Sequence, residues 1–142
     1  MWRFFKNDVA DNAISEDDNY RNILVILTDG YLYHENSKDN EGNRSMSLLP
    51  QDVQKYGFRS NNWKDKFDKD NYGYISTRDV LKNLDVLVLE INPSPKDKDD
   101  EDVIKTYLKK WFEEMKVNKF ELYNSDLPQY TKTRIDKFIT NG

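Results

Sequence analysis

The chain has 142 residues, the length of a single domain, and carries a formal net charge of -4 with a pI near 5.1. Charged residues make up 34% of the sequence and the mean hydropathy is -0.96, but an aromatic content of 13% argues against a disordered chain. The absence of cysteine excludes disulfides, thiolate metal sites and cysteine nucleophiles. A single histidine excludes a zinc site built from several histidines of one chain.

Several classes of function are disfavoured by the distribution of apolar and charged residues. No apolar run approaches the roughly 18 residues that a membrane-spanning helix needs, and the first residues lack the pattern of a signal peptide. Basic residues are scattered and the net charge is negative, so we expect no nucleic-acid partner. No acid, base and nucleophile stand in a recognisable catalytic pattern, so we expect a soluble, non-enzymatic domain over residues 1–142 and leave its compartment open.

Helical periodicity begins near the N-terminus, where Trp2, Phe5 and Val9 predict a short helix. Three segments further along have the composition of strands. The runs at 23–27 and 86–91 are almost continuously apolar, which predicts strands covered on both faces, as in parallel sheets. The third, at 119–123, alternates apolar and polar residues, as expected for a strand nearer a sheet edge.

Two more helices are predicted in the C-terminal half. A stripe of apolar residues at helical spacing follows the acidic residues 99–102, which suit a helix N-terminus; the stripe comprises Val103, Ile104, Tyr107, Leu108, Trp111, Phe112 and Met115. The last helix is expected to open at Leu127-Pro128, with proline in its first turn. Its predicted inward residues are Thr131, Ile135, Phe138 and Ile139.

Alternation of strands and helices predicts an α/β fold with three layers, a mostly parallel sheet flanked by helices and right-handed crossovers. The exception is a long polar insertion at about 31–84, in which only short helical turns are expected, around 48–56 and 63–67. No repeat or flexible linker divides the chain, which predicts a single domain.

Thr28-Asp29-Gly30 directly follows the first apolar strand. This pattern resembles the von Willebrand factor A domain, at the strand that carries the third segment of its metal-ion-dependent adhesion site, and 84–93 looks like the next strand. The resemblance covers about 1–30 and 84–140, extends to uncharacterised von Willebrand-like proteins of gut bacteria, and implies the C-terminal half of that Rossmann-like fold. It implies a domain that binds a protein partner through loops at the carboxyl ends of the strands.

The same resemblance implies that Asp29 helps to hold Mg²⁺. The family's Asp-x-Ser-x-Ser segment is absent, however, and one aspartate cannot supply the several oxygen ligands that Mg²⁺ needs. The alternative role for Asp29 is to cap the turn before Gly30. A receiver-like signalling domain is a further resemblance, with Glu90 standing where the phosphoacceptor Asp would be needed.

A calcium-binding module is the alternative function, because residues 68–79 resemble an EF-hand loop with glycine at its sixth position. The predicted Ca²⁺ ligands are Asp68, Asp70, Tyr74, Ser76 and Asp79. The match departs from the motif because Tyr72 replaces an oxygen ligand and a strand, not a helix, follows the loop. Chance similarity in a chain rich in Asp and Asn is the competing interpretation.

Tyrosines of the insertion are the predicted partner-binding residues, above all Tyr31 and Tyr33, since tyrosine is favoured at interfaces. Tyr56, Tyr72 and Tyr74 are also expected to be exposed. The resemblance further implies that strand 23–27 has a free edge, because the strand that pairs with it in the family is missing here. A protein partner, a second copy in a homodimer, an N-terminal half or the insertion itself would cover that edge.

Overall fold

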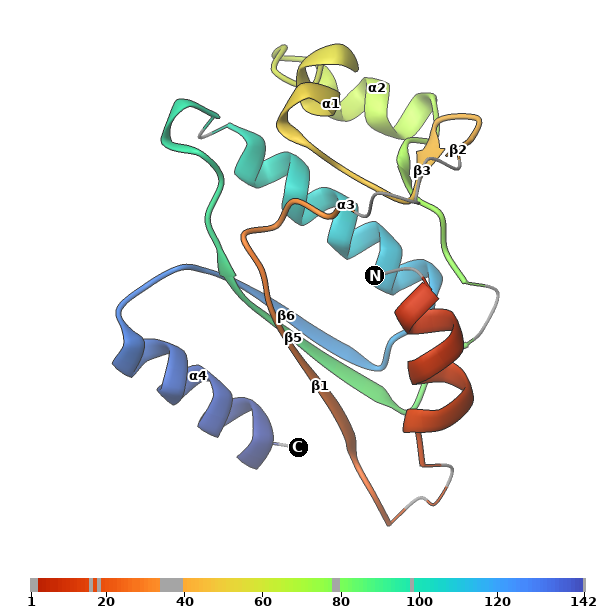
Figure 1. Ribbon diagram of the computed structural model, residues 1–142, viewed down its shortest axis with the longest axis vertical. Coiled ribbons are helices and arrows are strands. Elements are labelled where there is room, and N and C mark those ends of the chain that lie inside the picture. Colours follow the sequence, from red (N-terminus) through yellow and green to blue (C-terminus); the bar gives the residue numbers. More distant parts are fainter. Residues whose placement is uncertain are drawn as a thin grey trace.

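The computed structural model describes residues 3–15, 17, 19–33, 40–77, 80–97 and 99–141. Its centre is a sheet of three parallel strands, β1 (Asn22–Leu27), β5 (Leu84–Ile91) and β6 (Lys119–Asn124), in the order β1-β5-β6 (Figure 1). Helices flank this sheet, so the predicted α/β class with a parallel sheet is confirmed. All three predicted strands are present.

Burial separates the central strand from its neighbours. Nearly every residue of β5 is buried, as its continuous apolar run predicts. β1 was also predicted to be covered on both faces, and this is wrong: only Ile26 is buried, and Leu27 is 65% exposed. The reason is that β1 lies at the edge of the sheet, beside β5 alone among the described residues.

Helix α3 (Asp100–Glu114) covers one face of the sheet, and its predicted apolar stripe is entirely buried. The N-terminal helix η1 (Phe4–Ala13), wound as a π-helix, packs on the same side, with the Phe5 ring 4.9 Å from that of Trp111. Trp2 lies outside the described residues. A short 3-10 helix, η2 (Pro95–Asp97), leads into α3.

Helix α4 (Pro128–Thr140) covers the opposite face, where Phe138 packs with Leu87 and Leu89 of β5. Its start at Pro128 is confirmed. The prediction that Ile139 points inward is wrong, because its side chain is about half exposed. Phe138 takes the buried position on the last turn, and the next residue of a helix is rotated by about 100° away from it.

The insertion is folded rather than irregular. It contains α1 (Pro50–Lys55), α2 (Trp63–Lys69) and a small sheet of β2 (Asn40–Glu41), β3 (Arg44–Ser45) and β4 (Gly73–Tyr74), in the order β2-β3-β4 (Figure 1). Both predicted helical turns are confirmed. The insertion packs on the outer side of α3, where Phe67 and Tyr74 contact the ring of Tyr107.

This packing overturns one expectation about the tyrosines. Tyr72 and Tyr74 are buried, not exposed, because they form part of the aromatic cluster that joins the insertion to α3. Tyr56 is partly buried in the same cluster. Across the described ranges, none of the helices combines the length and the apolar character needed to cross a membrane.

Candidate functional site

The carboxyl ends of the three parallel strands lie at one edge of the sheet, which is where open α/β sheets bind ligands. Asp29 follows β1, Asn92 follows β5, and Ser125 follows β6. Backbone hydrogen bonds tie the three loops together: Asn92 N–H donates to the Asp29 carbonyl at 3.0 Å, and Ser125 N–H donates to the Ile91 carbonyl at 2.9 Å. The loops after β1, β5 and β6 are therefore joined to one another at this edge of the sheet.

The loop after β1 is a tight, fixed turn. Asp29 is exposed, and its Oδ1 accepts the Tyr31 N–H at 3.0 Å, while Thr28 Oγ1 accepts the Gly30 N–H at 3.0 Å. Gly30 has φ +104, and a Cβ there would approach Ile104 Cγ2 to 2.6 Å. Only glycine fits this approach to α3, so Asp29 is held at a defined position at the carboxyl edge.

The geometry around Asp29 fits turn capping and does not fit a Mg²⁺ site. One carboxylate oxygen of Asp29 already accepts a backbone hydrogen bond. Within the described ranges, no three Asp, Glu, His or Cys side chains are grouped so that they could hold a metal ion. Because Mg²⁺ needs near-octahedral oxygen ligands, Asp29 alone does not supply such a site, and Mg²⁺ binding stays a prediction.

Glu90 also belongs to this edge. In the sequence it was notable only because it stands where a receiver domain would need its phosphoacceptor Asp. Its backbone has φ +68, and the register of β5 with β6 shifts between Val88 and Ile91. Its carboxylate accepts hydrogen bonds from Thr131 Oγ1 at 2.6 Å and from Ser125 Oγ at 2.7 Å. These two hydroxyls, that of Thr131 most, lower the pKa of Glu90, which is therefore ionised at neutral pH.

A cleft of about 310 Å³ lies at the carboxyl ends of β5 and β6. Its lining combines apolar groups with amides, a hydroxyl and one carboxylate: Ile91, Asn92, Pro93, Pro95, Glu101, Asn124 and Ser125. Hydrogen bonds from Lys105, the larger effect, and from Asn124 lower the pKa of Glu101. The Lys105 ammonium lies 2.7 Å from Glu101 Oε1. The cleft thus presents an ionised carboxylate, paired through Oε1 with Lys105, beside uncharged hydrogen-bonding groups.

The two predicted partner-binding tyrosines occupy different environments. Tyr33 is 57% exposed. Tyr31 is partly buried against the core, and its hydroxyl donates to Asp100 Oδ2 at 2.9 Å. Tyr31 therefore has a structural role in holding the start of the insertion against α3, whereas Tyr33 is free to offer its ring to a partner. Partner binding by either stays a prediction.

The described residues of the predicted calcium loop lie on helix α2, on strand β4 and in the segments that follow them. Asp68 belongs to the last turn of α2, Asp70 ends that helix, and both side chains are exposed. Tyr74 lies in β4, and Ser76 follows it. Asp79 lies outside the described residues. Helix α2 lies where an EF-hand has its entering helix. Two residues after Asn71, however, the chain enters strand β4, which pairs in parallel with β3.

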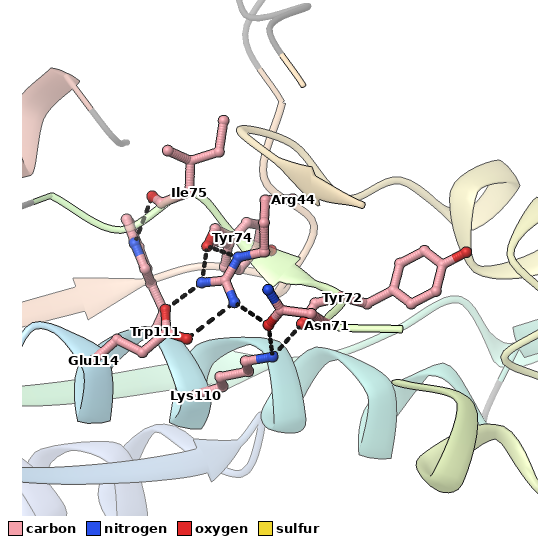
Figure 2. A network of polar contacts seen from close by, with 8 residues as sticks. All are labelled: Arg44, Asn71, Tyr72, Tyr74, Ile75, Lys110, Trp111 and Glu114. Carbon is pink, nitrogen blue, oxygen red and sulfur yellow. Dashed lines mark hydrogen bonds and ion pairs between the residues drawn. The ribbon is translucent and has the colours of Figure 1, made fainter. Parts of the chain in front are cut away.

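Two positively charged side chains, Arg44 and Lys110, donate hydrogen bonds to oxygen atoms of this loop (Figure 2). The Arg44 guanidinium donates to the Tyr74 carbonyl through Nε at 3.0 Å and Nη2 at 2.6 Å, and it also pairs with Glu114. Lys110 Nζ donates to the Tyr72 carbonyl at 2.7 Å and to Asn71 Oδ1 at 3.0 Å. The carbonyl assigned to Ca²⁺ thus faces the protein's own positive charge, and calcium binding stays a prediction.

A larger groove of about 560 Å³ runs between β6 and α4. Its charged side chains are largely paired with one another: Arg134 with Asp126 at 3.0 Å, and Lys119 with Glu121 at 3.3 Å. The Arg134 guanidinium also lies over the ring of Tyr123, 4.6 Å from its centroid. The groove is therefore an internally balanced polar surface with little net charge to recruit a ligand.

Comparison with known proteins finds no matching family model, no matching curated protein and no matching solved structure. Membership of the von Willebrand factor A family therefore stays a prediction from the sequence.

Proposed function

We propose that this chain is a non-enzymatic recognition domain that binds a basic segment of a protein partner at the carboxyl edge of its sheet. The observation that carries this proposal is the cleft beside β5 and β6, in which the ionised Glu101 lies among two amides and a hydroxyl, with Lys105 paired to its Oε1. Amides and hydroxyls suit the backbone of an extended peptide, and a carboxylate suits a lysine or arginine side chain.

Charge at this edge supports a basic partner. Glu90 and Glu101 both have a lowered pKa, and Asp29 is exposed at the neighbouring loop. Lowered pKa values also make these carboxylates poor proton donors near neutral pH, where a general acid needs a pKa close to the working pH. The same features therefore favour a binding surface over a catalytic one.

The fold that we propose for this function is the C-terminal half of a von Willebrand factor A-like domain. Its support is the parallel order β1-β5-β6, together with the strand–Thr–Asp–Gly pattern that puts Asp29 at the carboxyl edge. Loops on a rigid sheet are common carriers of recognition. The exposed Tyr33, on the segment that leaves this edge, would extend the contact with the partner.

A library of random linear peptides displayed on phage tests this proposal. We expect the peptides enriched on the whole chain to be rich in lysine and arginine, and their binding to weaken as salt is raised. Replacing Glu101 with glutamine should raise the Kd of an enriched peptide about three- to tenfold, since it removes one partly exposed charge pair.

The matched control is Glu113→Gln, which makes the same change at an exposed position near the other end of α3. This variant should bind the enriched peptides as the wild type does. Selection of neutral or acidic peptides, equal binding by the Glu101→Gln variant, or a library without any binder would each contradict the proposal.

A further inference from the structure

The outer side of β1 has backbone groups with no strand beside them in the described part of the chain (Figure 1). Thr28 N–H donates to the Leu89 carbonyl of β5 at 3.1 Å, and this bond shows which residues of β1 direct their backbone groups toward β5. Since successive residues of a strand direct their N–H and C=O groups to opposite sides, Leu24 and Ile26 face β5. The N–H and C=O groups of Ile23, Val25 and Leu27 therefore face away from the sheet.

This edge lacks the protection that exposed edges normally carry. Proteins place charges, prolines or bulges on edge strands to prevent pairing with other chains. The opposite edge, β6, follows this rule with Lys119 and Glu121. β1 has neither charge nor proline between residues 23 and 27, and it leaves Leu27 65% exposed. An edge of this kind is a template for pairing with another strand.

The sequence of this edge is complementary to itself. Residues 21–29 read Arg-Asn-Ile-Leu-Val-Ile-Leu-Thr-Asp, with a cation at one end, an anion at the other and an apolar centre. In an antiparallel pair of two copies centred on Val25, Arg21 lies opposite Asp29 of the second copy, at both ends. Asn22 lies opposite Thr28, and every apolar residue lies opposite an apolar one. Opposite charges placed across strands stabilise such pairs.

The orientation of the backbone agrees with this register. The outward-facing Val25 would pair with its own equivalent, and the outward-facing Ile23 with Leu27 of the second copy, on each side of the symmetry axis. Antiparallel residues that face one another exchange two hydrogen bonds, so the arrangement forms about six. Within its own chain, Arg21 donates to Asp85 through Nε and to the Ile139 carbonyl through Nη1, so Asp29 of the second copy would add to an existing ion pair.

We propose that two copies of this chain associate through antiparallel pairing of their β1 edges, which joins the two sheets into one. A two-fold axis through Val25 makes the contact isologous and closed, the commonest arrangement of homodimers. The proposal does not depend on the proposed function: the two share only Asp29, and the recognition cleft itself lies at the ends of β5 and β6 and not along β1.

Analytical ultracentrifugation of the whole chain over a range of concentrations tests the association. We expect a reversible dimer of twice the chain's 17.0 kDa. Replacing Leu27 with lysine should raise the Kd of the dimer at least about tenfold, because each lysine would lie against Ile23 of the second copy. The matched control is Leu127→Lys, which makes the same change at a position 55% exposed before α4.

A second pair of variants tests the register. Asp29→Asn keeps a side chain that can cap the turn but removes the charge opposite Arg21, so we expect a rise of about two- to fivefold in the Kd of the dimer. Asp102→Asn, at an exposed position of α3, should leave the Kd unchanged. In the wild type, the amides of Ile23, Val25 and Leu27 should exchange slowly with solvent, and faster in Leu27→Lys, while circular dichroism stays the same.

Several results would overturn the proposal. One is a monomer at every concentration with rapid exchange of these three amides. Another is a dimer that Leu27→Lys and Leu127→Lys weaken equally, which would place the contact elsewhere. A dimer unaffected by Asp29→Asn would rule out the register centred on Val25.

Discussion

At the scale of single residues, Asp100 joins parts of the molecule that are far apart in the sequence. Its side chain is fully buried at the start of α3. It accepts hydrogen bonds from Arg59 Nε and Nη2, both at 3.1 Å, and from the Tyr31 hydroxyl at 2.9 Å. A buried carboxylate is stable only when its oxygens are fully paired, so this contact fixes the insertion to the helix.

We therefore expect Asp100→Asn to lower the free energy of unfolding by roughly 2–4 kcal/mol, because it removes the charge that Arg59 pairs with. Urea denaturation followed by tryptophan fluorescence measures the change. Asp102→Asn is the matched control, since Asp102 is exposed in the same first turn and carries the same charge near the helix N-terminus. Equal losses in both variants would mean that helix electrostatics, and not the buried contact, sets the effect.

At the scale of elements, local patterns predicted what the elements are but not all of their environments. The stripe from Val103 to Met115 predicted α3 because a helix shows its buried face in its own spacing. The run at 23–27 predicted a strand, but its half-exposed state depends on which strands lie beside it. Tyr74 likewise became buried through α3, which lies far along the chain, and the Tyr72 ring packs against Tyr56 and Phe58.

Some residues of the candidate site could likewise be predicted from their sequence neighbours, and others could not. Asp29 could be placed at the carboxyl edge because a strand, a threonine and a glycine adjoin it in the sequence. Glu90 could not be assigned its role, because its hydrogen bond to Thr131 spans 41 residues and its backbone depends on the irregular register with β6. The one local signal was a charged residue inside an otherwise apolar run.

The turn after α2 provides a prediction at this scale. Because Arg44 donates to the Tyr74 carbonyl and Lys110 to the Tyr72 carbonyl, we expect isothermal titration with millimolar Ca²⁺ to give no saturable heat. In Arg44→Ala, the Tyr74 carbonyl loses its partner, and the same titration measures whether any affinity appears. Saturable binding by the wild type would instead support the calcium loop predicted from residues 68–79.

At the scale of the whole molecule, the insertion and the sheet domain share one aromatic core. Tyr74 from the insertion and Tyr107 from α3 meet there, with ring centroids 5.0 Å apart. Both hydroxyls are buried and neither has a hydrogen-bond partner. Burial, more than neighbouring groups, raises the pKa of Tyr74 and the pKa of Tyr107. Deprotonation of either phenol therefore opposes the packing of the insertion on the sheet domain.

This arrangement predicts how stability falls at alkaline pH. Above a pH of about 10, the unfolded chain loses its phenol protons while the folded chain keeps those of Tyr74 and Tyr107, so the free energy of unfolding decreases as pH rises. Each buried phenol contributes up to about 1.4 kcal/mol per pH unit to this decrease. Tyr107→Phe should thus flatten the decline by about one such contribution, and leave stability at pH 7 within about 0.5 kcal/mol, because its hydroxyl has no partner to lose. Urea unfolding between pH 7 and 11 measures both effects. The exposed Tyr20, changed to phenylalanine, should retain the wild-type decline, and an equal flattening in the two variants would contradict the role of the buried pair.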